Sequence, residues 1–67
     1  MMIIYLNGEE RQVPAGTSLP ELIGQLELDP RGVAVERNRE IVMKSHWDQT
    51  ILAEGDQLEL VQFVGGG

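Results

Sequence analysis

The sequence predicts a single small α+β domain, in which one helix packs across one face of a mixed sheet of four to five strands. Three observations support this prediction: a hairpin signal near the start, one segment with helical spacing and a capping signal, and strand-like segments after it. A chain of 67 residues makes one domain, and folding at this size buries only about 60% of the unfolded surface. An enzyme with a deep, self-contained active site is therefore not expected.

The first expected element is a β-hairpin. Residues 2–6 form an apolar run rich in β-favouring side chains, and Asn7-Gly8 follows it directly. An Asn-Gly pair between two strands is the strongest short hairpin signal, because both residues accept the positive φ angles of a type I′ turn. Residues 9–13 are then the return strand, which Pro14 ends.

One helix is expected after the hairpin. Ser18, with Glu21 three residues later, forms a capping-box pattern in which each side chain bonds the backbone N–H of the other residue. Apolar residues follow at helical spacing, namely Leu19, Leu22, Ile23 and Leu26. The helix should end near Pro30, because proline disfavours helical backbone in the residue before it.

The rest of the chain predicts three more strands. Residues 33–37 and 40–43 flank a tight turn, and residues 57–63 form the last strand. Trp47 lies in a polar connection, where we expect a short helical turn against the sheet edge. Because the helix separates the hairpin from the later strands, the right-handed crossover rule leaves few arrangements, and we expect the first and last strands as parallel central neighbours.

Alternation along the strands assigns the side chains to two faces. The helix covers one face, where the expected core consists of Met2, Ile4, Leu6, Val13, Leu19, Leu22, Ile23, Leu26, Val33, Val35, Ile51, Leu58 and Leu60. No second helix is available for the other face, which carries Tyr5, Val61 and Phe63. We expect these three to form a contiguous exposed apolar patch, the usual mark of a partner-binding surface. A register one residue different would bury them instead.

Composition and charge argue against several classes of function. Eleven acidic residues against five scattered basic ones give a net charge of −6, which argues against nucleic-acid and anionic membrane surfaces. The chain has no cysteine and one histidine, His46, so neither a disulfide framework nor a metal site is expected. Neither a membrane-spanning run nor a signal-peptide pattern is evident, so we expect a cytoplasmic protein.

The sequence ends in Gly65, Gly66 and Gly67 directly after a strand-like run. Glycine has no Cβ, so such a terminus can enter a slot too narrow for any side chain and present its carboxylate to a partner. We therefore expect a domain over residues 1–64 and a flexible tail over residues 65–67, with Gly65 and Gly66 threading the slot. The alternative is a frayed end without function.

Four features together indicate a family. The turn at Asn7-Gly8, residues 13–19 before the helix, Gly55-Asp56 before the last strand and the glycine end resemble the ubiquitin-like β-grasp sulfur carriers, most closely those of thiamine thiazole biosynthesis. The resemblance implies a carrier protein and not an enzyme, with the β-grasp fold. One departure is Gly65, where many members have another small residue.

The resemblance also implies partners and a chemistry. The Gly67 carboxylate would be adenylated by an E1-like adenylating enzyme (ThiF-like) that uses ATP, converted to a thiocarboxylate, and used as sulfur donor by thiazole synthase (ThiG-like). The carrier itself would bind no cofactor and be a monomer when alone. Independently of the family, a chain without cysteine can carry sulfur covalently only on its terminus.

Two alternatives stay open. A related carrier for molybdopterin or another pathway would use the same Gly67 carboxylate with a different acceptor enzyme. A β-grasp binding module would not use the terminus, whereas a ubiquitin-like protein modifier would join it to a lysine.

Overall fold

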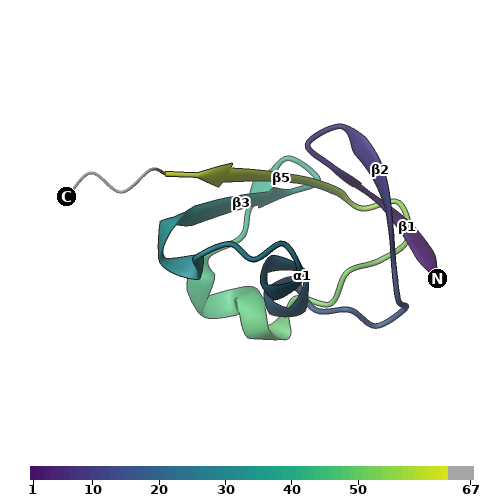
Figure 1. The fold of residues 1–67 in the computed structure, drawn as a ribbon, viewed down its shortest axis with the longest axis horizontal. Helices are drawn as coiled ribbons and strands as arrows, with labels where there is room; N and C mark the ends of the chain where they lie inside the picture. Colours follow the sequence, from purple (N-terminus) through teal and green to yellow (C-terminus); the bar gives the residue numbers. More distant parts are fainter. Residues whose placement is uncertain (64–67) are drawn as a thin grey trace.

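A five-stranded mixed sheet organises the chain, with the helix on one side of it (Figure 1). The computed structural model describes residues 1–63. The expected domain boundary at residue 64 and the three glycines Gly65, Gly66 and Gly67 lie outside the described residues. The strands are β1 (Met2–Leu6), β2 (Glu9–Val13), β3 (Val33–Arg37), β4 (Glu40–Ile41) and β5 (Gln57–Gln62).

The sheet order is β2-β1-β5-β3-β4, so the last strand occupies the centre. Strands β1 and β5 are parallel, with Tyr5 opposite Gln57, and β5 runs antiparallel to β3. This confirms the predicted parallel pairing of the first and last strands and the predicted mixed sheet. Strand β5 therefore has β1 beside its first two residues, Gln57 and Leu58, and β3 beside residues 58–62.

Two hairpin turns carry backbone that most residues avoid. Asn7 and Gly8 have φ angles of 51° and 84°, which are the positive values that a type I′ turn requires. Asn38 and Arg39 join β3 to β4 with φ angles of 51° and 71°. Arg39 thus occupies the left-handed region without being glycine, a conformation that is costly for a long side chain.

The helix α1 (Leu19–Gln25) begins as predicted but ends sooner. The backbone N–H of Ser18 donates to Glu21 Oε1 at 2.9 Å, and the N–H of Glu21 donates to Ser18 Oγ at 3.3 Å, which confirms the capping box. The predicted end near Pro30 is wrong, because Glu27 adopts a left-handed φ of 58°. The N–H of Glu27 donates to Gly24 and that of Leu28 to Ile23, so the helix closes in a Schellman motif without glycine.

Two short 3₁₀ helices follow, η1 (Pro30–Gly32) and η2 (Lys44–Gln49). The segment η2 is the helical turn expected around Trp47, which is 5% exposed and donates its Nε1–H to the carbonyl of Val42 at 3.0 Å. The side chain therefore packs in the core between α1 and the sheet. Among residues 1–63, no helix is long and apolar enough to cross a membrane.

The core lies between the sheet and α1. It consists of two adjoining clusters, one with Met2, Ile4, Val13, Leu22, Leu52 and Leu58, the other with Leu19, Ile23, Val33, Val35 and Trp47. Leu6, Leu26 and Leu60 pack against these clusters while partly buried. The prediction for Ile51 is wrong: it is 50% exposed, because the N–H of Leu52 bonds the carbonyl of Thr17 at 2.9 Å and Leu52 takes the buried position.

Candidate docking face and tail exit

The sheet has one covered face and one open face. Helix α1 and the segment η2 lie on the same side of the sheet, and no helix of residues 1–63 lies on the other side (Figure 1). Tyr5, Val61 and Phe63 are 38%, 54% and 63% exposed, as alternation from the buried Ile4 and Leu58 requires. The predicted assignment of these side chains to the covered and the open face is therefore confirmed.

The three apolar residues do not form the single contiguous patch that we expected. Tyr5 pairs with Gln57 in the β1–β5 register, so Val61 lies four positions further along β5. At about 3.3 Å per residue this separates the two positions by roughly 13 Å along the strand. Tyr5 stands at one end of the open face, while Val61 and Phe63 stand at the end where β5 leaves the sheet.

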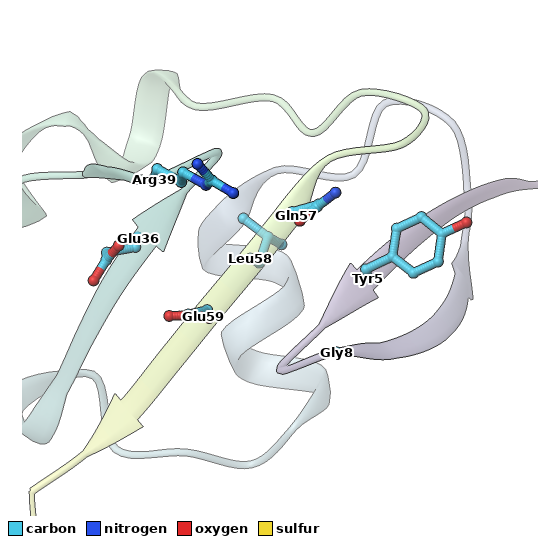
Figure 2. Close-up of a pocket in the computed structure, with 7 residues that line it drawn as sticks. All are labelled: Tyr5, Gly8, Glu36, Arg39, Gln57, Leu58 and Glu59. Carbon is cyan, nitrogen blue, oxygen red and sulfur yellow. The ribbon is translucent and has the colours of Figure 1, made fainter.

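Polar residues occupy the space between these two ends. Glu36 on β3 and Glu59 on β5 are directly opposite each other in the ladder. Figure 2 shows both side chains on the face turned away from α1, with Gln57 and Arg39 nearer to Tyr5. Beyond the glutamates, Ala34 and Ile41 join Val61 in lining an apolar hollow.

The last described residue is held at a defined position. The N–H of Phe63 donates to the carbonyl of Gly32 at 2.7 Å, one residue after β5 ends. A Cβ on Gly32 would lie 3.1 Å from the carbonyl oxygen of Phe63, closer than side chains normally approach. Gly32 is thus a site residue that the sequence analysis missed, because only the tertiary structure places it beside Phe63.

Strand β5 is also fixed on its other side. Beyond the end of β1, the side chain of Asn7 makes the backbone hydrogen bonds that a neighbouring strand would otherwise make. Its Oδ1 accepts from the N–H of Leu60 at 2.9 Å, and its Nδ2 donates to the Leu60 carbonyl at 3.3 Å. The hairpin residue Asn7 therefore has two functions, as a turn former and as a clamp on β5. The sequence signal for the turn gave no indication of the clamp.

A buried carboxylate fixes the start of the same strand. Asp56 is 5% exposed, and its Oδ2 accepts from Arg37 Nε at 2.9 Å and from the N–H of Ala53 at 2.8 Å. Asn38 Nδ2 donates to the other oxygen at 3.1 Å, and Asn38 Oδ1 accepts from the N–H of Gln57. The network ties the β3–β4 turn to the beginning of β5, so the strand is held along its length.

Within residues 1–63, no group of three or more His, Asp or Glu side chains could hold a metal ion. His46 lies exposed in η2, away from the open face. What the arrangement provides is a hydrogen-bonded platform that leads β5 to a defined end at Phe63.

Comparison with known proteins shows which family and which solved structures this chain resembles. The ThiS family model matches residues 4–67. The sulfur carrier protein ThiS of Escherichia coli is 38% identical over 66 residues, covering 98% of this chain and 100% of that protein. The crystal structure of the thiamine biosynthesis protein (ThiS) from Geobacter metallireducens superposes with a TM-score of 0.84 at 30% identity, covering 98% of this chain and 100% of that one.

A longer relative also matches. The thiazole synthase of Paramagnetospirillum magneticum is 50% identical over 66 residues, which cover 98% of this chain but only 20% of that protein. The thiazole synthase of Magnetococcus marinus is 46% identical with the same coverage. The chain thus spans about a fifth of the length of these two relatives and the full length of the ThiS protein of Escherichia coli.

Proposed function

The chain belongs to the ThiS family and has its β-grasp fold, and we propose that it carries sulfur for the thiazole part of thiamine biosynthesis. The observation that supports this most strongly is the match to the ThiS family model, which extends from residue 4 through the glycines to residue 67. The carrier acts in the cytoplasm as a monomer between partners, binds no cofactor of its own, and is a co-substrate rather than an enzyme.

The proposed working group is the carboxylate of Gly67. A carboxylate is a poor electrophile, because nucleophilic attack must add charge to a group that is already an anion. An E1-like adenylating partner overcomes this with ATP: the carboxylate oxygen attacks the α-phosphorus, diphosphate leaves, and an acyl adenylate forms. A persulfide of the partner then attacks the acyl carbon with its outer sulfur and AMP leaves, which gives an acyl disulfide. A second thiol of the partner attacks the inner sulfur, so the S–S bond breaks, a disulfide forms on the partner and the terminus keeps the outer sulfur as a thiocarboxylate.

The platform described above supports this use of the terminus. The Gly32–Phe63 hydrogen bond and the Asn7 clamp fix where β5 ends, so a partner that grips the domain also determines where the following residues begin. Four residues from Val64 to Gly67 span at most about 14 Å when extended. Holding the acyl group within that reach of a reactive centre replaces a diffusional encounter with a positioned one.

The proposed acceptor of the sulfur is thiazole synthase. The two thiazole synthases that match this chain contain a segment like it within one protein. The presence of such a segment within a thiazole synthase supports a complex between this domain and a separate synthase. The thiocarboxylate enters the synthase on the glycine residues and gives up its sulfur there.

The test is removal of the terminal residues. Deleting Gly66 and Gly67 should abolish transfer of AMP from labelled ATP, while the melting temperature changes by less than about 2 °C, because β5 ends at Gln62, four residues before the deletion begins. Gly66→Val should also block the reaction if the partner's slot excludes side chains.

Gly24→Ala is the matched control, since a Cβ there meets nothing within 4 Å and adenylation should stay normal. A truncated chain that still accepts AMP would refute the proposal.

A further inference from the structure

Two glutamates oppose each other at the centre of the open face. Glu36 on β3 and Glu59 on β5 form one register pair, and Figure 2 shows both side chains on the face that α1 does not cover. Like charges directly opposite each other across two strands destabilise a sheet. The free domain therefore retains a pair whose repulsion uncharged side chains at the two positions would remove.

No cation within the described residues neutralises this pair. The ion pairs of residues 1–63 join Asp29 to Arg31 and Arg37 to Asp56. Arg39 lines the same hollow as the two glutamates but forms an ion pair with neither. The carboxylates are thus available to a cation from outside the domain.

The residues around Glu36 and Glu59 indicate whether the cation is a free metal ion or part of a protein side chain. Glu36 and Glu59 line both hollows of the open face, the polar one near Tyr5 and the apolar one with Ala34, Ile41 and Val61. A free metal ion would gain nothing from the apolar side. A protein side chain with a cationic end and neighbouring aliphatic groups would use both hollows together.

Charge complementarity favours a basic protein surface. The chain carries a net charge of −6, and a third glutamate, Glu10, pairs with Tyr5 on the same face. Such a face repels phosphate groups, so nucleic acids and anionic lipids do not fit it. Arginine suits a pair of carboxylates better than lysine does, because its planar guanidinium presents several donors in a fixed geometry.

We propose that thiazole synthase docks on this face by placing an arginine between Glu36 and Glu59 and covering Val61 and Phe63 with apolar side chains. The inference rests on the proposed function, from which it takes the partner, and adds the groups that recognise it. The like-charge pair is tolerated in the free domain and becomes favourable in the complex. Removing the charges should therefore stabilise the carrier alone and weaken its complex.

The test compares two double variants of equal charge. Glu36→Gln with Glu59→Gln should weaken binding to purified thiazole synthase by about tenfold or more at low salt, with a smaller loss at high salt. It should raise the melting temperature of the free domain by about 2–5 °C, because the repulsion across β3 and β5 is gone.

The control is Glu9→Gln with Glu27→Gln. Glu9 pairs with Leu6 and so lies on the other face, and Glu27 follows α1, so affinity should change less than about twofold. Unchanged affinity in the Glu36 and Glu59 variant, an equal loss in the control, or a loss of affinity accompanied by a lower melting temperature would overturn the inference.

Sulfur loading separates this inference from the proposed function. At saturating adenylating enzyme and ATP, the wild-type chain and both double variants should acquire the terminal thiocarboxylate equally. If the wild-type chain acquires none, the proposed function fails. If the wild-type chain acquires the thiocarboxylate, and the Glu36 and Glu59 variant binds the synthase with unchanged affinity, only the docking inference fails.

Discussion

The two faces of the sheet show how one set of strands divides stability from recognition. Ile4 and Leu58 point toward α1 and are fully buried, whereas Tyr5 and Val61, one and three positions further along the same strands, stay exposed. Each strand thus serves the core and the open face on alternate residues. A change on one face should therefore affect stability, and a change on the other should affect partners.

The largest expected effect is on the covered face. Leu22→Ala removes a fully buried side chain from the core between α1 and the sheet, so the free energy of unfolding should fall by about 2–5 kcal/mol. For a domain of this size that is a large part of its total stability. Urea denaturation followed by circular dichroism measures it, and a loss below about 1 kcal/mol would contradict the assignment of this face.

The next effect concerns the exit end of the open face. Phe63→Asp should weaken binding to thiazole synthase by about tenfold or more, because an apolar hot spot becomes a charge. The free energy of unfolding should change by no more than about 0.5 kcal/mol, since Phe63 is 63% exposed.

Ile51→Asp is its control, an equivalent change at a residue that is 50% exposed and lies in the connection before β5. It should leave the affinity for the synthase unchanged. Severe unfolding of Phe63→Asp would mean that the two faces are reversed.

A smaller effect tests the fixed exit point. Gly32→Ala places a Cβ 3.1 Å from the Phe63 carbonyl, so β5 must shift by a few tenths of an ångström where it leaves the sheet. We expect a stability loss of about 1 kcal/mol and a slower sulfur transfer at saturating partner. Gly24→Ala, where a Cβ meets open space, should show neither effect. Normal transfer by Gly32→Ala would show that the exit position is not critical.

The smallest effect is the pH dependence of the helix cap on the covered side. The Ser18 backbone N–H, and then its hydroxyl, hold the pKa of Glu21 below its ordinary value of 4.5. A lowered pKa in the folded state contributes stability that is present above the unfolded pKa and disappears as the pH falls through the folded one.

Glu21→Gln should therefore lower the melting temperature slightly at pH 7 and leave it unchanged well below the folded pKa. Thermal unfolding across that range measures the difference. A constant difference at all pH values would exclude the carboxylate as the cause.

Local signals predicted most of the elements. The Asn7-Gly8 turn and the capping box at Ser18 each depend on a few neighbouring residues, and the structure has both. The crossover rule left few arrangements, and the expected one, with β1 beside β5, is confirmed. These features depend on backbone preferences and chain handedness, which the sequence expresses directly.

The errors arose where tertiary contacts decide. The sequence pattern did not show whether Ile51 or Leu52 is buried. An isolated β-bridge between Ser18 and Ile51 determines which of the two side chains faces the core. The helix ends because Glu27 adopts a left-handed φ, and no glycine at that position signals this in the sequence. The separation of Tyr5 from Val61 depends on the β1–β5 register, which strand alternation alone does not provide.

Intact mass tests whether the folded domain delivers a chemically active terminus to its partners. The chain is incubated with the adenylating enzyme, ATP and a sulfur donor, then fragmented. We expect a mass gain equal to the exchange of one oxygen for sulfur, confined to the fragment that contains Gly67. A gain on a fragment from residues 1–63, or full loading of a chain that lacks Gly66 and Gly67, would contradict it.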